Sequence, residues 1–231
     1  MTAATTTHPA ILLQALERVT GDPKHKPSSL STLDVLWVLY DRVLRVDPQT
    51  VDDPERDRFV LSKGHGPAAF YAVLAAKGFF PLDWLDTMGA WTSRLGYHPD
   101  RTLVPGVEIG SGSLGHGLGL AVGIALGLRA QGNTTSRTVV LVGDAELDEG
   151  SNHEAIAYAG AIGLDSLTAV VVDNDSSTHG WPGGVGSRFT VNGWTLSTVD
   201  GRDHDAIESG LRAGTGKGPH VVVAVTERKG S

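Results

Sequence analysis

The chain has 231 residues, a formal net charge of −7 and no cysteine, with 40% hydrophobic and 19% charged residues. This length suits one domain with a sizeable core, the negative charge argues against nonspecific nucleic-acid binding, and the lack of cysteine excludes disulfides and thiolate metal sites. No apolar run approaches the roughly 18 residues of a membrane-spanning helix, and the first residues lack a secretory pattern. We therefore expect residues 1–231 to form one domain of a soluble, cytoplasmic protein with no membrane partner, residues 1–7 being a flexible tail.

Helical patterns dominate the first half of the chain. Helices are expected at residues 8–19, at 31–46 with Ser31 as a candidate N-cap, and at 67–76, where a proline opens the first turn. Residues 117–132 form a glycine- and alanine-rich helical pattern with few bulky side chains. This composition predicts the close approach of another helix or subunit.

The second half alternates strands and helices. Residues 138–142 and 167–172 are short β-branched runs, typical of strands buried on both faces of a parallel sheet. Between them, Ser151 and Glu154 have the spacing of a helix capping box. A strand, a helix and a strand in this order make two parallel strands that end at the same edge of the sheet. Residues 194–226 repeat the pattern, so we expect an α/β fold.

A polar residue follows each of these two strands. Asp144 comes after the first run and Asn174 after the second, 30 residues later. Because ligands bind at the carboxyl ends of parallel strands, a carboxylate and an amide oxygen there suit Mg²⁺, which completes its shell with phosphate oxygens and water. A Gly-Asp dipeptide alone would more often open a solvated loop. The spacing to Asn174 favours a magnesium and diphosphate site instead.

Longer motifs resemble those of the transketolase family. GDAELDEGSNHEA, followed by VVDN, resembles its thiamine diphosphate signature, and SSLSTLDVLWVLY, RDRFVLSKGHGPAAFYAVL, GYHPD and PGVEIGSGSLGHGLGLAVG precede it in the family's order. These blocks cover most of positions 25–180 and are most similar to the amino-terminal half of split transketolases. The resemblance implies a three-layer, parallel-sheet thiamine diphosphate-binding (PP) domain that uses thiamine diphosphate and Mg²⁺.

The same resemblance assigns a cofactor site. His65, flanked by two glycines, would contact the diphosphate, although alone it could be a turn histidine. The metal ligands would be Asp144, Asn174 and the backbone carbonyl of Ser176. The remaining cofactor contacts would be Gly112, Ser113, Leu114, Ala145 and Glu146. Ala145 replaces the second glycine of the family's Gly-Asp-Gly, which is tolerable where its φ is negative.

Three residues are candidates for catalysis by resemblance. Glu149 corresponds to a glutamate that meets the partner's catalytic glutamate across the subunit interface; from the residues alone it is one more acid in an acidic loop. His25 and His98 would lie on the substrate side, where imidazoles transfer protons near neutral pH. His116 occupies a position where glutamine is common in the family, which leaves its role open.

The family's pyrimidine-binding domain, which carries the cofactor-activating glutamate, has no counterpart in this sequence. A separate carboxyl-terminal subunit is implied, in a hetero-oligomer with two copies of each chain. Family members also continue through a segment with a histidine near the cofactor, beyond the point where this chain ends. The implied reaction moves a two-carbon ketol unit from a ketose or ketose phosphate to an aldehyde. The alternatives are the same cofactor acting on a 2-oxo acid in specialised metabolism, and a noncatalytic partner-binding subunit. Ala145 and the short carboxyl end leave the second alternative open, and it is disfavoured by Asp144, Asn174, His65 and Glu149.

Overall fold

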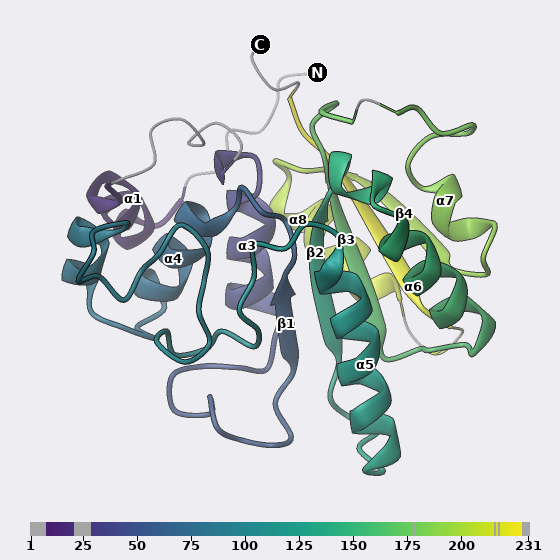
Figure 1. Cartoon of the computed structure of the whole chain (residues 1–231), viewed down its shortest axis with the longest axis horizontal. Coiled ribbons are helices and arrows are strands. Elements are labelled where there is room, and N and C mark those ends of the chain that lie inside the picture. The colour runs from purple at the N-terminus through teal and green to yellow at the C-terminus, as the bar shows by residue number, and fades with distance from the viewer. Residues whose placement is uncertain (1–7, 21–28, 178, 215, 217, 228–231) are drawn as a thin grey trace.

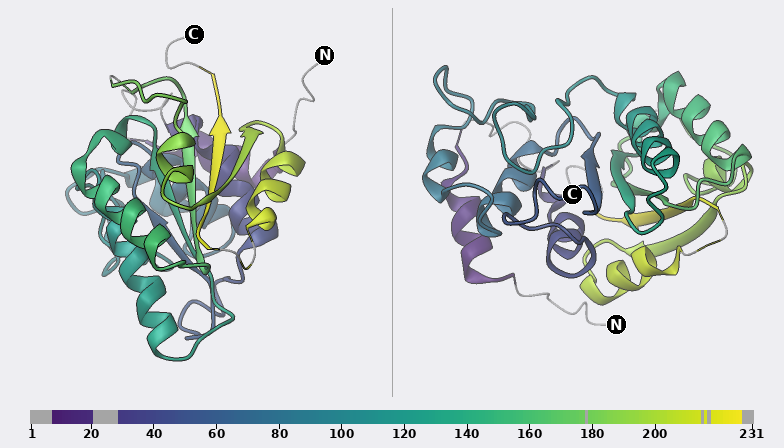
Figure 2. Two further views of the ribbon diagram at one scale, coloured as in Figure 1. Left: turned by 90° about the vertical axis from the view of Figure 1, so that its right-hand side faces the viewer. Right: turned by 90° about the horizontal axis from the view of Figure 1, so that it is seen from below.

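A parallel sheet of five strands forms the centre of the molecule. The computed structural model describes residues 8–20, 29–177, 179–214, 216 and 218–227. In space the strands lie in the order β1-β2-β3-β5-β4, and every neighbouring pair is parallel. All carboxyl ends therefore meet at one edge of the sheet (Figure 2). The strands are β1 (Arg58–Leu61), β2 (Thr138–Gly143), β3 (Leu167–Asp173), β4 (Thr195–Asp200) and β5 (His220–Val225).

Helices cover both faces of this sheet, which confirms the expected three-layer α/β fold (Figure 1). Side chains alternate along each strand, so that Val139 packs into one core layer and Val140 into the other. Because both layers are apolar, the strands read as continuous hydrophobic runs. The first layer contains α1 (Ala10–Arg18), α3 (Leu33–Val38), α4 (Pro67–Ala76) and α8 (His204–Ala213); the second contains α5 (His116–Ala130), α6 (Gly150–Ala161) and α7 (Ser187–Thr190).

Two predicted helix caps are wrong, for the same physical reason. The N-cap of α3 is Thr32, and the hydroxyl of Ser31 instead accepts a hydrogen bond from Lys63 Nζ at 2.9 Å. Helix α6 begins at Gly150, and the hydroxyl of Ser151 donates to the carbonyl of Gly115 at 2.8 Å. In both cases a partner distant in sequence engages the hydroxyl, which a local pattern cannot reveal.

Short helical turns extend or connect these elements. The expected helix over residues 31–46 continues beyond α3 as a π-helical turn, η1 (Leu39–Val43), and ends there. Two 3₁₀ turns, η2 (Leu82–Thr87) and η3 (Ala145–Asp148), follow α4 and β2. Helix α5 is the longest α-helix at 15 residues, and none of the described helices has the length and apolarity to cross a bilayer. The predicted flexible tail, residues 1–7, lies outside the described residues.

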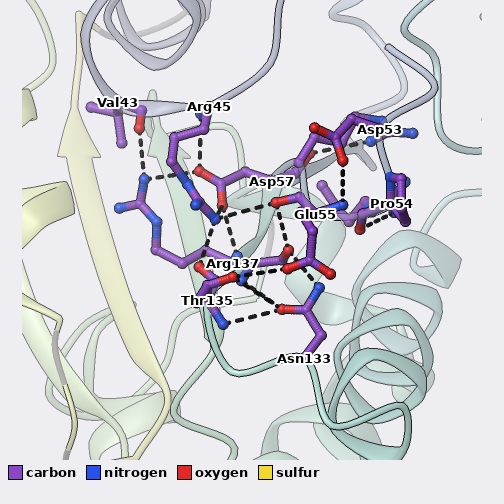
Figure 3. A network of polar contacts seen from close by, with 12 residues as sticks. Val43, Arg45, Asp53, Pro54, Glu55, Asp57, Asn133, Thr135 and Arg137 are labelled. Carbon is purple, nitrogen blue, oxygen red and sulfur yellow. Dashed lines mark hydrogen bonds and ion pairs between the residues drawn. The ribbon is translucent and has the colours of Figure 1, made fainter. Parts of the chain in front are cut away.

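A buried carboxylate joins the amino-terminal ends of β1 and β2 (Figure 3). Asp57 has no exposed surface, and each of its two oxygens accepts two hydrogen bonds. The donors are the guanidinium groups and backbone N–H groups of Arg45 and Arg137, at 2.8–3.0 Å. Burial alone would raise the pKa of Asp57, but these donors, Arg45 foremost, hold it below its usual value. Asp57, at the amino edge of the sheet, is thus fully paired by the chain's own groups.

Candidate functional site

The structure brings Asp144 and Asn174 to neighbouring strand ends. Strand β2 ends at Gly143, which pairs with Val172 of β3, and the N–H of Asp144 donates to the Val172 carbonyl at 3.2 Å. Asp144 and Asn174 are each only 2% exposed. Two polar side chains from segments 30 residues apart therefore lie in the interior at the carboxyl edge of the sheet.

The carboxylate of Asp144 is held by the segment that follows β3. Its Oδ1 accepts from the hydroxyl of Ser176 at 2.6 Å, and its Oδ2 accepts from the backbone N–H groups of Ser176 and Ser177 at 2.6 and 3.0 Å. The turn passes through Asp175, which is the only non-glycine residue of the described ranges with a positive φ, 52°. Because a carboxylate oxygen can accept two hydrogen bonds, Oδ1 keeps a free lone pair.

Asn174 has an amide oxygen without a hydrogen-bond donor. Its Oδ1 is buried and makes no hydrogen bond within the described structure. Buried polar atoms of this kind are nearly always paired, and one left open marks a place for a ligand. A carboxylate beside an amide oxygen is the donor set of a hard cation such as Mg²⁺. The residues present therefore fit the metal that the sequence predicts.

A cavity of about 220 Å³ opens next to these strand ends. The residues that follow β1, β2 and β3 contribute to it, together with the loop before α5. His65 is exposed at this cavity, and Leu114 is 46% exposed, so both can meet a ligand. Its lining consists of Lys63, Gly64, His65, Leu114, Gly143, Ala145, Glu146 and Ser176.

Glu146 joins three loops around this cavity. It is 1% exposed and accepts hydrogen bonds from the Ser62 hydroxyl, from the Gly115 N–H at 3.0 Å and from the Gly143 N–H at 3.1 Å. Burial raises the pKa of Glu146, and these donors offset only part of that effect. The carboxylate is thus engaged by the chain's own groups, which positions the loops of the predicted cofactor site.

Ala145 introduces no backbone strain. It opens the 3₁₀ turn η3, and it is absent from the positive-φ residues of the described chain. A methyl group is therefore accommodated where the family's glycine would stand. Ala145 lines the cavity, so the substitution lies next to the space available to a ligand.

The loop before α5 contacts two of the predicted catalytic residues. Gly112 has a φ of 120°, and a Cβ there would lie 2.7 Å from Cγ of His98, so the imidazole packs against the glycine. Gly115 likewise packs against Glu149, whose Cβ would lie 2.6 Å from an added Cβ. His98 and Glu149 are both exposed, as are Ser113 on this loop and His116, the first residue of α5. His25 lies outside the described residues.

Sequence reasoning missed the residues that brace the segment after Asn174. Arg188 donates to Asp148 at 2.6 Å and lies over the Trp181 ring at 4.9 Å, and the hydroxyl of Ser177 donates to Asp148 at 3.0 Å. Burial would raise the pKa of Asp148, but Arg188 and Ser177 lower it. Asp148 therefore belongs to a folded network rather than to a solvated acidic loop, and a partner 40 residues away leaves no local signal.

A second group of metal-ligating side chains lies away from this cavity. Nε2 atoms of His8 and His204 approach Asp34 Oδ1 at 3.2 and 2.8 Å. Arg202 donates to the other oxygen of Asp34 at 2.6 Å. Because an arginine already neutralises this carboxylate, the group is a weaker candidate for a metal site than the strand ends.

Comparisons with known proteins agree with this geometry. Residues 6–226 match the family model described as "Transketolase, thiamine diphosphate binding domain". A protein of Rhodococcoides fascians named "Ferredoxin fas2" is 52% identical over 93% of this chain and 70% of that protein. One of the subunits of apulose-4-phosphate transketolase from Actinobacillus succinogenes is 36% identical over 88% of this chain and 76% of that protein. This chain contains no cysteine, the usual ligand of iron–sulfur clusters.

A solved structure shows the same fold. A mutant transketolase from Pichia stipitis in complex with fructose 6-phosphate superimposes with a TM-score of 0.76 at 28% identity. The match covers 88% of this chain and 36% of that one, so the chain spans about a third of the length of the solved enzyme. The family match over most of the residues and the shared fold lead to one conclusion. The chain belongs to the transketolase family, as its thiamine diphosphate-binding domain.

Proposed function

We propose that this chain is the diphosphate- and magnesium-binding subunit of a two-chain transketolase. The enzyme moves a two-carbon ketol unit from a ketose or ketose phosphate to an aldehyde. The observation that carries this proposal is the buried, unpartnered Oδ1 of Asn174 beside Asp144, at the carboxyl edge of a parallel sheet. An open oxygen acceptor at that edge is what a magnesium-bound diphosphate requires.

Each predicted cofactor residue has a role in this proposal. Asp144, Asn174 and the backbone carbonyl of Ser176 hold Mg²⁺, while His65 and the backbone of Ala145 bind the diphosphate. Leu114 provides an apolar wall for the cofactor rings, with Gly112 and Ser113 beside it, and Glu146 fixes the loops. Thiamine diphosphate, when bound, supplies the reactive carbon and the electron sink. The protein supplies orientation and electrostatics.

In this proposal, a second chain completes the site around the substrate-side residues. His98 and Glu149 are exposed on either side of the loop before α5. We assign His98 and His25 to contacts with substrate hydroxyl groups and to proton transfer, and Glu149 to a contact with the partner's catalytic glutamate. The exposure of Leu114 supports this arrangement, because an apolar side chain there is covered only when the cofactor and a second chain are present.

The partner in this proposal carries the pyrimidine-binding domain. The relative from Actinobacillus succinogenes is named as one subunit of its transketolase, which supports a division of the enzyme between chains. We propose a cytoplasmic assembly with two copies of each chain, in which residues 1–231 contribute one domain. Roughly half of the cofactor's contacts then come from the partner, so the isolated chain binds the cofactor weakly and does not turn over substrate.

Reconstitution tests this proposal. The chain is mixed with the product of the neighbouring reading frame, Mg²⁺ and thiamine diphosphate, and supplied with a ketose phosphate and an aldehyde acceptor. Ketol transfer is expected from the pair and from neither chain alone. Robust transfer by this chain alone would contradict the two-chain proposal. Consumption of pyruvate in place of ketose phosphates would instead assign a 2-oxo acid donor.

A further inference from the structure

A lysine lies buried beside the proposed diphosphate site. Lys63 follows β1 and is 7% exposed, although it lines the cavity. Its aliphatic stem runs along Gly143 at the end of β2, where a Cβ would meet Cγ, Cε and Cδ of Lys63 at 3.4–3.6 Å. These are ordinary van der Waals distances, so the stem packs closely against the end of β2.

Polar groups from two directions hold the ammonium. Nζ of Lys63 donates to the hydroxyl of Ser31 at 2.9 Å, just before α3. The positive charge of Lys63 also lowers the pKa of Glu146, against the larger effect of burial. A buried ammonium is costly unless it is paired, and these groups provide partners for Lys63.

The negative charge at the cavity favours a positively charged side chain there. The acidic Glu146 lines the cavity, the acidic Asp144 lies between the lining residues Gly143 and Ala145, and a diphosphate adds further negative charge that a single Mg²⁺ offsets only in part. Of the described residues that line the cavity, Lys63 is the only lysine or arginine. Because the cavity is partly enclosed, an ammonium there acts more strongly than one on the surface.

We propose that Lys63 is a diphosphate-binding residue of this site, its ammonium serving as a fixed positive charge for the phosphate oxygens. Lysine binds phosphate in this way, as a compact point charge. Ser31 sets the position of the ammonium, which also attracts the carboxylate of Glu146. This inference rests on the proposed function, because it names a further residue of the same cofactor site. A lysine that only holds loops together would leave ligand affinity unchanged.

Binding to the full chain in the presence of Mg²⁺ tests the proposal. Inorganic diphosphate and thiamine diphosphate are titrated into the wild type, Lys63→Met, Lys63→Arg and the control Lys77→Met, followed by calorimetry and by ³¹P NMR for weak complexes. Lys77 bonds to Asp41 at 3.0 Å, away from the cavity. Lys63→Met should lower the affinity for both ligands roughly 10- to 100-fold, and Lys63→Arg should recover part of this affinity. Lys77→Met should bind like the wild type.

The salt dependence of ligand binding distinguishes an electrostatic contribution of Lys63 from a steric one. Raising the ionic strength should lower the ligand affinity of the wild type more steeply than that of Lys63→Met. The variant lacks one of the charge–charge attractions that salt screens. Equal affinity of wild type and folded Lys63→Met would overturn this proposal while leaving the cofactor site intact. A wild-type chain that binds neither ligand would overturn the proposed function instead.

A second measurement does not depend on the variant folding. In the ¹⁵N-lysine-labelled wild type, addition of Mg²⁺ and diphosphate should shift the Lys63 ammonium signal, whereas thiamine without phosphates should not. An unmoved signal at saturating diphosphate would overturn the assignment.

Discussion

The two edges of the sheet use similar residues for opposite purposes. At the amino edge, each oxygen of Asp57 accepts two hydrogen bonds from Arg45 and Arg137, and the pKa of Asp57 is lowered (Figure 3). At the carboxyl edge, Oδ1 of Asn174 accepts none, and the pKa of Glu146 is raised by burial. Polar groups that are fully hydrogen-bonded within the chain stabilise the fold, whereas buried polar groups without a partner can bind a ligand. This contrast between Asp57 and Asn174 favours the carboxyl edge as the place where a ligand binds.

We expect the largest effect on stability from a substitution at the amino edge of the sheet. Asp57→Ala leaves Arg45 and Arg137 without their shared carboxylate and should lower the free energy of unfolding by about 3–5 kcal/mol. Urea denaturation followed by circular dichroism measures this. Asp52→Ala, at an exposed aspartate nearby, should change it by less than about 0.5 kcal/mol. Equal stabilities for the two variants would contradict a structural role for the Asp57 network.

The open edge predicts the largest effect on binding. Asp144→Ala removes a metal ligand and should raise the Kd for thiamine diphosphate with Mg²⁺ at least about 100-fold in the assembled enzyme. The exposed Asp165, which precedes β3 at the opposite end of that strand, provides the control, since Asp165→Ala should retain binding within about threefold. Calorimetry with and without Mg²⁺ measures both. Unchanged binding by Asp144→Ala would remove this residue from the metal site.

The orphaned amide oxygen allows a finer comparison. Asn174→Ala should weaken Mg²⁺-dependent binding about tenfold and cost little stability, because Oδ1 of Asn174 has no partner to lose. The control is Asn152→Ala in α6: Oδ1 of Asn152 also lacks a partner, but its amide donates to the Glu146 carbonyl at 2.6 Å. That variant should lose stability without losing the metal dependence. Reversed effects would mean that Asn174 is a structural residue.

The pH dependence of stability should have opposite signs at the two edges. Because its pKa is lowered on folding, Asp57 contributes stability above its unfolded pKa of about 4, and this is lost as the pH falls through the folded value. The pKa of Glu146 is raised, so its favourable contribution is present below about pH 4 and is lost as the pH rises. Urea denaturation of Asp57→Asn and Glu146→Gln across this range should show the two opposite trends. If both variants changed the pH dependence of stability in the same direction, the proposed difference between the two edges would be wrong.

Local patterns predicted the elements but not the long-range contacts. The β-branched runs gave β2 and β3, and proline at the start of α4 fixed its bounds, because these signals lie within a few residues. The caps at Ser31 and Ser151 were wrong, since each hydroxyl binds a distant group. Asp144 and Asn174 were predictable because they follow strands.

Lys63 and Arg188 show where the sequence signal ends. Lys63 also follows a strand, so the strand-end rule applied to β1 could have found it. Arg188 could not be found in this way, because only the folded chain brings it to Asp148. The positions of candidate site residues in the fold were therefore predictable where they follow a strand, and unpredictable where a side chain reaches from another segment.

One measurement tests the central claim, that the carboxyl edge of the sheet is the metal and cofactor site. Crystals grown with thiamine diphosphate and Mn²⁺ in place of Mg²⁺ would give an anomalous peak at the bound ion. We expect a peak about 2.0–2.3 Å from Asp144 and from Oδ1 of Asn174, with diphosphate density beside it. A peak at the group formed by His8, Asp34 and His204, with none at the strand ends, would contradict the account.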